Sequence, residues 1–546
     1  MPLADIREIS LAYGLNHYLV DGSLRAVLGS HRVDHGILEP LGAYTGREVY
    51  EAAYNGDLRS SPILANWSIT GDKVDLALLD PLEKRVLEDL VTVYGVNRHP
   101  FEGRPWHLHY ASLYLVADGG IGCILTITVQ TAHAVYKYGG EHRSLYRGLA
   151  GIDEPLWGAT WFTEVQGGSD LGANQTVAVE SGGVWRLNGY KYFASGAGVA
   201  DYALVTARMP DGGKGVRGLG LFLVPRLDSS GGLNYHVRRL KWKSGTRLVP
   251  TGEVEFDGSE AYLLAGAGRG IYIALEDLMV SRLATGIGSL GLARKAYLEA
   301  LLYSTRRRAF GKRIIDHPLQ ARDLMEMALS IDAGLAVAFK AVEEWNRAWL
   351  EEPPYTSVYH HARLLTHMMK NHASDISVSV TRQAVEALGG IGTLHEYTVE
   401  RWHREAMIMP VWEGTSNIQT LDLLEAMAKK GAHEAMLDDV RGLAGEVGDS
   451  SVARRTLERI EYYVRRLGED AAGGVWEAKH LLSKLADSYA TLLLAWTAEK
   501  AGDPVFEEEA RLYYSWRLDT GMPRPSTDVL YGVLSMHGGV ELGSGS

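Results

Sequence analysis

Hydrophobic and polar positions follow different periods in successive parts of this chain. Residues 1–157 contain amphipathic helical stretches, such as Asp80–Val96, separated by Gly-rich breaks. Residues 158–267 show short alternating runs punctuated by Gly, Asn, Asp and Pro, a pattern typical of strands and turns. Helical periods return in residues 268–430 and continue through 431–546. The pattern predicts an α+β protein with a mostly helical N-terminal domain, a middle β-domain, a C-terminal helical bundle and a helical C-terminal extension.

Two stretches of the third region read as neighbouring helices of that bundle. Tyr272–Arg308 and Asp323–Trp349 both keep helical periods, with a turn around Pro318 between them. The Gly/Ser-rich end of the chain is expected to be disordered. The segment Gly286–Gly291, GIGSLG, matches a dinucleotide fingerprint, but that fingerprint has to follow a strand and open a helix. Because the match lies inside a helical pattern, we interpret its glycines as helix-packing positions.

Size, charge and cysteine content narrow the class of protein. A chain of 546 residues indicates several domains, and its apolar runs are shorter than the ~18 residues that a membrane helix needs. No secretory signal is visible, so we expect a cytoplasmic protein without membrane association. The single cysteine, Cys123, is expected to be a small buried hydrophobic side chain, and we predict no metal site. The net charge of −12 disfavours general attraction to nucleic acid, although a local basic patch could still bind it.

A polar, Gly-rich turn opens the predicted β-domain. Thr163–Asp170 spells TEVQGGSD, in which glycines permit close backbone approach and hydroxyls can bond to ring nitrogens or phosphate oxygens. Taken alone, this segment could equally be an ordinary polar turn. Downstream, Phe193 and Ser195 share one face of a strand, because residues i and i+2 point the same way. An aromatic ring beside a hydroxyl would suit the edge of a flavin.

Glu413 is the candidate general base. It lies between Trp412 and Gly414 after an apolar stretch, and a carboxylate that loses hydration has a raised pKa and is a better base near neutral pH. The alternative is structural: Glu413 precedes Thr415, Ser416 and Asn417, which could simply cap the start of a helix.

The order of these segments resembles the acyl-CoA dehydrogenase family. Its members carry a TE-x-x-x-GSD turn, an NG-x-K-x-(W/F)-x-(T/S) strand, an R-x-x-FG helix end, a GG-x-G turn and an EGT segment, in that order. In this chain they stand at Thr163–Asp170, Asn188–Ser195, Arg307–Gly311, Gly389–Gly392 and Glu413–Thr415. In closer detail the chain is similar to the AidB-like subgroup, through VQGGSD, VWEGTSN, the long N-terminal region and the helical C-terminal extension.

The resemblance implies an acyl-CoA dehydrogenase fold with FAD as cofactor. Glu413 would be the general base, with the acyl chain between its carboxylate and the flavin. A loop arginine, Arg247, would be a second active-site residue, although it could also be a solvated hairpin arginine. The matching positions at and around the flavin are Thr160, Phe162, Thr163 and Ser195 at the isoalloxazine edge, Phe193 beside the ring, Gly168 and Ser169 near the pyrophosphate, and Thr415 and Asn417 next to the base.

The resemblance also implies that each FAD is shared between two subunits of a homotetramer built as a dimer of dimers. The positions that would hold the adenosine end in the neighbouring subunit are Arg307, Phe310, Glu386, Gly389 and Gly390. Most relatives have Gln at the positions of Pro318 and Glu386, so this chain lacks two amide contacts expected at that end.

Two functions follow from this resemblance. The first is α,β-dehydrogenation of an acyl-CoA thioester, with an electron-transfer flavoprotein as acceptor. The alternative is an AidB-like flavoprotein with weak dehydrogenase activity, whose C-terminal extension binds double-stranded DNA. Residues 431–546 contain 12 Lys and Arg against 19 Asp and Glu, a net charge of −7. An acidic extension is a poor partner for phosphates, so the sequence favours the enzyme.

Overall fold

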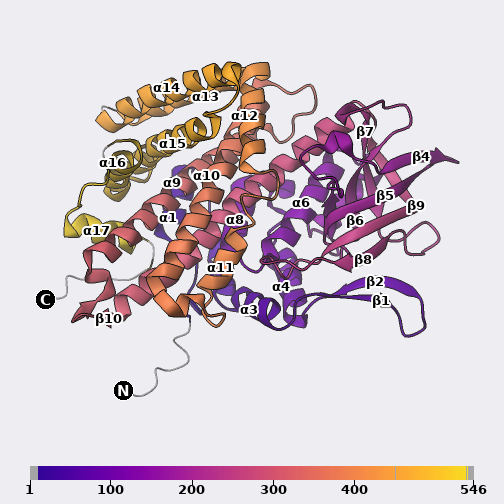
Figure 1. Ribbon diagram of the computed structural model, residues 1–546, viewed down its shortest axis with the longest axis horizontal. Coiled ribbons are helices and arrows are strands. Elements are labelled where there is room, and N and C mark those ends of the chain that lie inside the picture. The colour runs from indigo at the N-terminus through magenta and orange to yellow at the C-terminus, as the bar shows by residue number, and fades with distance from the viewer. Residues whose placement is uncertain (1–9, 449, 520, 537, 539–546) are drawn as a thin grey trace.

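The computed structural model describes residues 10–448, 450–519, 521–536 and 538 of the chain. Helices and strands follow the predicted order: a helical N-terminal part, a β-sheet, a bundle of long helices and a helical extension (Figure 1). The exact residue limits of the four regions remain a prediction from the sequence. The end of the chain that we expect to be disordered lies outside the described residues.

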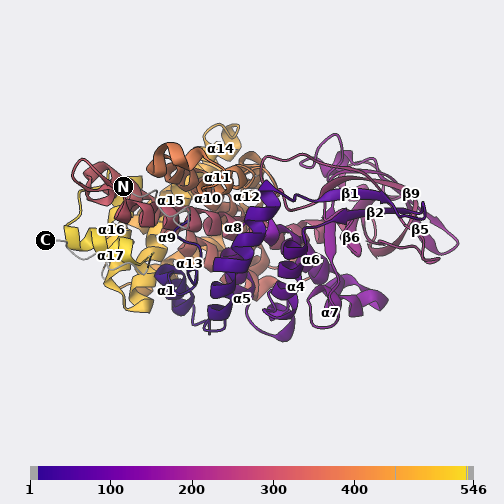
Figure 2. The same ribbon diagram turned by 90° about the horizontal axis from the view of Figure 1, so that it is seen from below.

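The N-terminal part is mainly helical, as predicted. Its helices are α1 (Gly22–Ser30), α2 (Leu38–Tyr44), α3 (Tyr50–Leu58), α4 (Pro81–Thr92), α5 (Trp106–Val116), α6 (Ile121–Tyr138) and α7 (Tyr146–Leu149), with a π-helical turn at Thr45–Val49. The sequence pattern did not predict the hairpin of β1 (Ile63–Trp67) and β2 (Lys73–Leu78), which lies along the sheet in Figure 2. Buried Asp75 anchors this hairpin, because its carboxylate accepts hydrogen bonds from Asn66 Nδ2 (2.6 Å) and from the Val237 backbone (2.9 Å).

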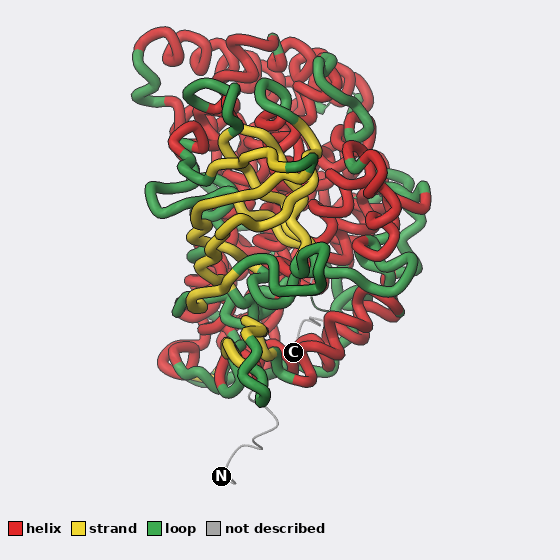
Figure 3. The backbone as a smooth tube through the Cα atoms, turned by 90° about the vertical axis from the view of Figure 1, so that its right-hand side faces the viewer, coloured by secondary structure: helices red, strands yellow, loops and turns green. Residues whose placement is uncertain are grey.

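The middle sheet is predominantly antiparallel and closes on itself. Its strands are β3 (Gly158–Trp161), β4 (Val177–Ser181), β5 (Val184–Ser195), β6 (Tyr202–Arg208), β7 (Leu219–Pro225), β8 (His236–Leu240) and β9 (Thr251–Ala265). Strands β6, β7, β9, β5 and β4 pair in a ring, because β6 contacts both β7 and β4. Figure 3 looks onto this sheet, with the helices behind and around it.

The bundle is built on long helices that run up and down. They are α8 (Gly270–Arg306), α9 (Pro318–Ala348), α10 (Ser357–Leu388), α11 (Val399–Ala406) and α12 (Ser416–Lys430), and a small hairpin of β10 (Arg308–Ala309) and β11 (Lys312–Arg313) joins α8 to α9. The two helices predicted on either side of the Pro318 turn are thus confirmed as α8 and α9.

Helix α8 is buried along almost its whole length. It is covered by α5 and α6 from the N-terminal part and by α9, α10 and α11 from the bundle. The GIGSLG glycines lie inside it, and the interpretation as helix-packing positions is confirmed for Gly286 and Gly291, whereas Gly288 lines a cavity. A Cβ on Gly291 would stand 2.2 Å from the Tyr114 carbonyl oxygen of α5, and one on Gly286 would stand 2.1 Å from Met369 Sδ of α10. Small residues at these two sites let α5 and α10 approach the α8 backbone closely.

The C-terminal extension folds onto the bundle. It consists of α13 (Ala432–Glu446), α14 (Ser451–Gly473), α15 (Ala478–Ala501), α16 (Pro504–Leu518) and α17 (Thr527–Ser535), and it covers the upper left of Figure 1. Helix α15 is the buried member and packs on α9. A buried ion pair reinforces the junction, because Lys340 Nζ of α9 lies 2.9 Å from Asp439 Oδ1 of α13. None of the described helices combines the length and apolar content that a bilayer crossing requires.

Gly291→Ala is predicted to destabilise the protein, because the added methyl meets a backbone carbonyl that cannot rotate away. Overpacking of this kind costs roughly 1–3 kcal/mol, which outweighs the gain in helix propensity. Gly288→Ala is the matched control on the same helix, since a Cβ there meets nothing within 4 Å. Alanine should stabilise that site by about 1 kcal/mol. The thermal unfolding midpoints should therefore move in opposite directions, and equal shifts would contradict the packing of α5 on α8.

Candidate functional site

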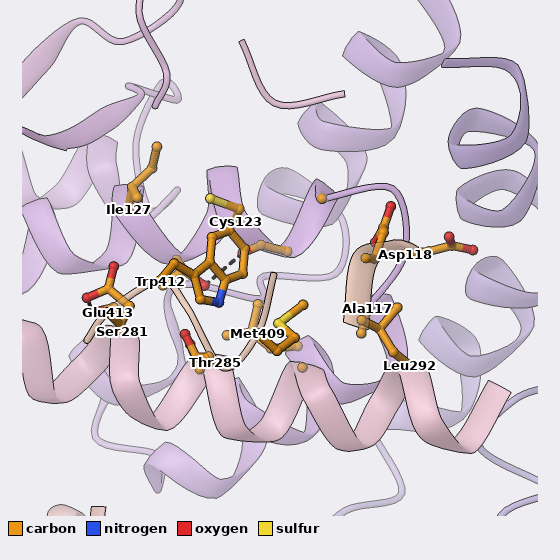
Figure 4. A pocket seen from close by; sticks show the side chains of 17 residues that line it. Ala117, Asp118, Cys123, Ile127, Ser281, Thr285, Leu292, Met409, Trp412 and Glu413 are labelled. Carbon is orange, nitrogen blue, oxygen red and sulfur yellow. Dashed lines mark hydrogen bonds between the residues drawn. The ribbon is translucent and has the colours of Figure 1, made fainter. Parts of the chain in front are cut away.

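A cavity of about 60 Å³ lies where the N-terminal part, α8 and the segment before α12 meet. Figure 4 shows Glu413 and Ser281 at one end of it and Asp118 and Leu292 at the other, with α8 running beneath. Apolar side chains dominate the walls between these ends, among them Leu113, Ile127, Met409 and Trp412. The candidate base predicted from the sequence therefore faces an apolar cavity.

The backbone at Glu413 is held in an unusual conformation. Glu413 has φ 57° and Gly414 has φ 100°, and the left-handed region is costly for a glutamate. Three side chains fix the two carbonyls that result. Gln419 Nε2 donates to both of them at 2.9 and 3.0 Å, Arg282 Nε donates to the Glu413 carbonyl at 3.1 Å, and Lys370 Nζ donates to the Gly414 carbonyl at 2.8 Å. This arrangement turns the Glu413 side chain towards the cavity.

The environment of the Glu413 carboxyl favours a strong base. The Ser281 hydroxyl donates to Glu413 Oε2 at 2.6 Å. Burial raises the pKa of Glu413, while the Ser281 hydrogen bond and the nearby Arg282 and Lys370 charges limit that rise. The carboxylate is thus a better proton acceptor than an exposed glutamate, while Ser281, Arg282 and Lys370 still stabilise its ionised form. The capping alternative finds no support at Thr415, which makes no side-chain cap hydrogen bond to α12.

The predicted flavin-edge residues gather on the sheet next to the bundle. Thr160 lies in β3, and its hydroxyl is buried without a hydrogen-bond partner among the described residues. Ser195 ends β5, and its hydroxyl lies 3.1 Å from Thr251 Oγ1. Phe193 is 54% exposed although it carries a large apolar ring. An unsatisfied hydroxyl and an uncovered ring on neighbouring strands fit the edge of a flat polar ligand.

The remaining residues of this set have distinct surroundings. Phe162 is buried beneath the turn, Thr163 and Gly168 face each other across it, and Ser169 is exposed. A Cβ on Gly168 would stand 2.5 Å from Thr163 Oγ1, so the turn needs glycine there. Thr415 and Asn417 are exposed at the start of α12, directly after the base.

A buried ion pair fixes the turn that carries these residues. Lys191 Nζ lies 2.8 Å from Glu164 Oε1, and Glu164 also accepts hydrogen bonds from the backbone N–H groups of Gln175 and Thr176. Burial alone would raise the pKa of Glu164, but Lys191 and these N–H groups hold that pKa below its usual value. Burial lowers the pKa of Lys191 to about 8. Both residues belong to the quoted motifs, yet the sequence reasoning gave them no role.

The predicted adenosine-end residues lie far from the cavity. Helices α8 and α10 contact each other at Gly286 and Met369. Arg307 lies 21 residues after Gly286 (307 − 286), and Gly390 lies 21 residues after Met369 (390 − 369). Since α8 and α10 run in the same direction, Arg307 and Gly390 lie near each other at one end of the bundle. Phe310 is 95% exposed there, and Glu386, Gly389 and Gly390 are exposed as well.

Arg247 does not line the cavity. Its nearest charged partner is buried Asp57, 3.9 Å from Arg247 Nε, and Asp57 is bound more closely by Arg404. Its catalytic role stays a prediction. Cys123 does line the cavity and is half-buried, and burial raises the pKa of its thiol to about 12. Among the described residues no group of three or more His, Cys, Asp or Glu side chains is placed to hold a metal ion.

Comparisons with known proteins agree on one family. The model of the acyl-CoA dehydrogenase middle domain matches residues 159–259, and that of the C-terminal domain matches residues 268–428. An acyl-CoA dehydrogenase of Bacillus subtilis is 30% identical over 311 residues, which cover 56% of this chain and 77% of that protein. The chain belongs to the acyl-CoA dehydrogenase family.

Two further members of the acyl-CoA dehydrogenase family are similar to the chain. The putative acyl-CoA dehydrogenase AidB of Escherichia coli is 31% identical over 335 residues, covering 61% of this chain and 57% of AidB. The crystal structure of Caenorhabditis elegans ACDH-11 in complex with C11-CoA superposes with a TM-score of 0.81 at 26% identity, covering 94% of this chain and 91% of that one. The structural match therefore includes the extension. In contrast, the sequence matches to AidB and to acyl-CoA dehydrogenase family member 11 of Caenorhabditis elegans each cover 57% of the relative.

Sequence reasoning missed the residues that support the candidate base. Ser281 and Lys370 approach Glu413 from α8 and α10, far away along the chain, and no local pattern marks them. Gln419 was easier to find from the sequence, since it lies in the first turn of the helix that follows the family's EGT segment.

Lys191→Met is predicted to destabilise this acyl-CoA dehydrogenase family member, because it leaves Glu164 buried without its cation. Removing one partner of a buried pair costs roughly 3–5 kcal/mol. In the double variant Lys191→Met, Glu164→Gln the uncompensated charge is gone, so it should unfold at a higher temperature than Lys191→Met alone. Additive losses in the thermal unfolding of the two single variants and the double variant would show that the ion pair does not fix the turn.

Proposed function

We propose that the protein is an FAD-dependent acyl-CoA dehydrogenase in which Glu413 removes a proton from the carbon α to the thioester carbonyl. The observation that carries the proposal is the Glu413 carboxyl, which faces an apolar cavity with a raised pKa and a hydroxyl donor at 2.6 Å. A positioned carboxylate of this kind suits abstraction of a weakly acidic proton. Family membership supports the reaction class.

The residues of this chain have separate tasks in the proposed reaction. Glu413 accepts the α proton on its carboxylate, and Ser281 holds one carboxylate oxygen so that the other is directed into the cavity. Trp412 and Met409 exclude water from the space where the acyl chain would lie. When bound, FAD supplies the acceptor for the hydride that leaves the β carbon. An electron-transfer flavoprotein as final acceptor and a cytoplasmic location stay predictions from the sequence.

The chain fits FAD in two ways. At the flavin edge, the unpartnered Thr160 hydroxyl and the Ser195 hydroxyl can bond to a ring, and Phe193 offers an uncovered aromatic face. The second way concerns the distance between the two predicted FAD sites. Ser281, beside the candidate base, and Arg306, at the exposed end of α8, are 25 residues apart (306 − 281), which corresponds to ~38 Å. That span is too long for one dinucleotide to reach both the flavin-edge residues and the adenosine-end residues of a single subunit. It supports sharing of FAD between subunits, and with it a homotetramer.

The DNA-binding alternative finds little support in the extension. Its net charge is negative, and arginines of α14 already have partners in the chain. Arg459 Nε donates to the Tyr514 hydroxyl at 3.2 Å, while Arg465 and Arg466 form ion pairs with Glu469 and Glu477 at 2.9 and 3.2 Å. A phosphate backbone would have to compete with these contacts. We therefore favour the enzyme.

Glu413→Gln is predicted to stop the reaction while the protein remains yellow with non-covalent FAD. The amide keeps the size of the side chain but cannot accept the proton, and a positioned base contributes ~10²–10⁴-fold. Anaerobic flavin bleaching by acyl-CoA esters measures the step. In the wild type the rate should fall as the pH drops through the raised pKa of Glu413, because the protonated carboxyl is no longer a base. Glu425→Gln, on the outer part of α12, is the control and should keep the wild-type rate. Bleaching by Glu413→Gln at the wild-type rate would rule out this base.

Arg307→Glu is predicted to reduce FAD content and oligomeric state together. The change puts a negative charge at the exposed end of α8, where the partner's FAD would carry its phosphates. Arg465→Glu makes the same change of charge on the outer face of the extension and serves as the control. Flavin content and mass by light scattering are measured on both variants. Full FAD occupancy in an Arg307→Glu tetramer would contradict a shared cofactor site.

A further inference from the structure

The far end of the cavity carries a second carboxyl group. Glu405, on α11, lines the cavity and is only 1% exposed, and its Oε1 has no hydrogen-bond partner among the described residues. It lies near Asp118, whose charge acts on it, and Asp118 marks the end opposite Glu413 in Figure 4. A buried carboxyl group that lines a cavity and has an oxygen without a partner points to a ligand group that completes its hydrogen bonding.

The neighbouring charged groups already have partners. Arg401 donates from Nε and Nη2 to the two oxygens of Asp118, both at 3.0 Å. Lys295 Nζ donates to the Ala117 carbonyl at 3.0 Å, and Lys243 Nζ donates to the Thr246 and Val249 carbonyls at 2.7 and 2.8 Å. Among these described groups, Glu405 is the one with a buried polar atom that has no hydrogen-bond partner at all.

The geometry points to a hydroxyl group on the acyl chain as the ligand of Glu405, so that this residue selects acyl-CoA esters whose chain is hydroxylated at its far end. The inference rests on the proposed function, because it assumes that the chain enters the cavity with its α carbon at Glu413.

A hydroxyl fits better than a charged group. Burial and the Asp118 charge raise the pKa of Glu405, which favours the protonated carboxyl, and this form both donates and accepts hydrogen bonds, as a hydroxyl does. An ammonium group would enter beside Arg401, Lys295 and Lys243, which repel it. A carboxylate would lose its hydration without finding a cation that lacks a partner.

The length of the cavity sets the position of that hydroxyl. Ser281 and Leu292 bound the cavity on α8 and are about three turns, or ~16 Å, apart. Contact distances of about 3 Å at each end leave roughly 10 Å for the chain itself. An extended chain advances by about 1.2 Å per bond, so about eight bonds beyond the α carbon, a chain on the order of ten carbons, reach Glu405 from Glu413. The substrate class is therefore a medium-length acyl-CoA with a terminal or near-terminal hydroxyl.

The test compares three CoA esters of equal length, decanoyl, 10-hydroxydecanoyl and 9-carboxynonanoyl, in anaerobic flavin reduction and in calorimetric binding. We expect kcat/KM to be about tenfold or more higher for the hydroxylated ester than for the plain one. Glu405→Leu should invert this preference, which a merely misfolded variant cannot do, and Glu405→Gln should retain it, since an amide also donates and accepts.

The possible outcomes separate the two proposals. Reduction by the plain ester at an equal or higher rate would overturn the role of Glu405 and leave the dehydrogenase proposal intact, and so would a preference for the carboxylated ester. Preferential binding of the hydroxylated ester without any flavin reduction would support the Glu405 site and contradict the reaction. Failure to bind any of the three esters would overturn both.

Discussion

The burial of α8 is the constraint on which the rest of the structure depends. A helix of 37 residues that is covered on nearly every side cannot rely on one neighbour, so it draws the N-terminal helices, the bundle and the edge of the sheet around itself. Close contact on opposite sides requires small residues at Gly286 and Gly291. The same helix then places Ser281 beside the base, Thr285 and Leu292 along the cavity, and Arg307 at the distant exposed end. One packed element thereby sets the spacing between the candidate base, the cavity and the predicted adenosine end.

Two buried ion pairs hold parts of the proposed site in place. Arg401 and Asp118, and Lys191 and Glu164, form paired bonds in the interior, which is the arrangement that makes buried charge tolerable. Such pairs add specificity of position more than net stability. The Glu164 pair holds the turn next to the predicted flavin edge, and the Asp118 pair holds the far wall of the cavity.

The fold was predictable from the sequence because its long elements have strong periods. The helical stretch around Asp80–Val96, the two helices around Pro318 and the β-rich middle were all confirmed. The β1–β2 hairpin was not predicted, since its stability comes from Asp75 bonding across to β8, which local alternation does not show. At the site, Glu413 could be chosen from its apolar surroundings and family motif. Ser281, Lys370 and Glu405 could not, because their importance arises only when α8, α10 and α11 converge.

The two carboxyl groups that line the apolar cavity, those of Glu413 and Glu405, have different proposed roles. Their surroundings differ in a way that favours those roles. Burial raises the pKa of both, but Glu413 has a hydroxyl donor and two nearby cations, Arg282 and Lys370, which favour its ionised form. Glu405 instead feels the negative charge of Asp118, while Arg401, the cation beside it, is bound to that same aspartate. The surroundings of the first carboxyl thus favour the ionised form, and those of the second favour the protonated form. Environment alone, acting on the same side chain, is enough to make one glutamate a base and the other a hydrogen-bond donor.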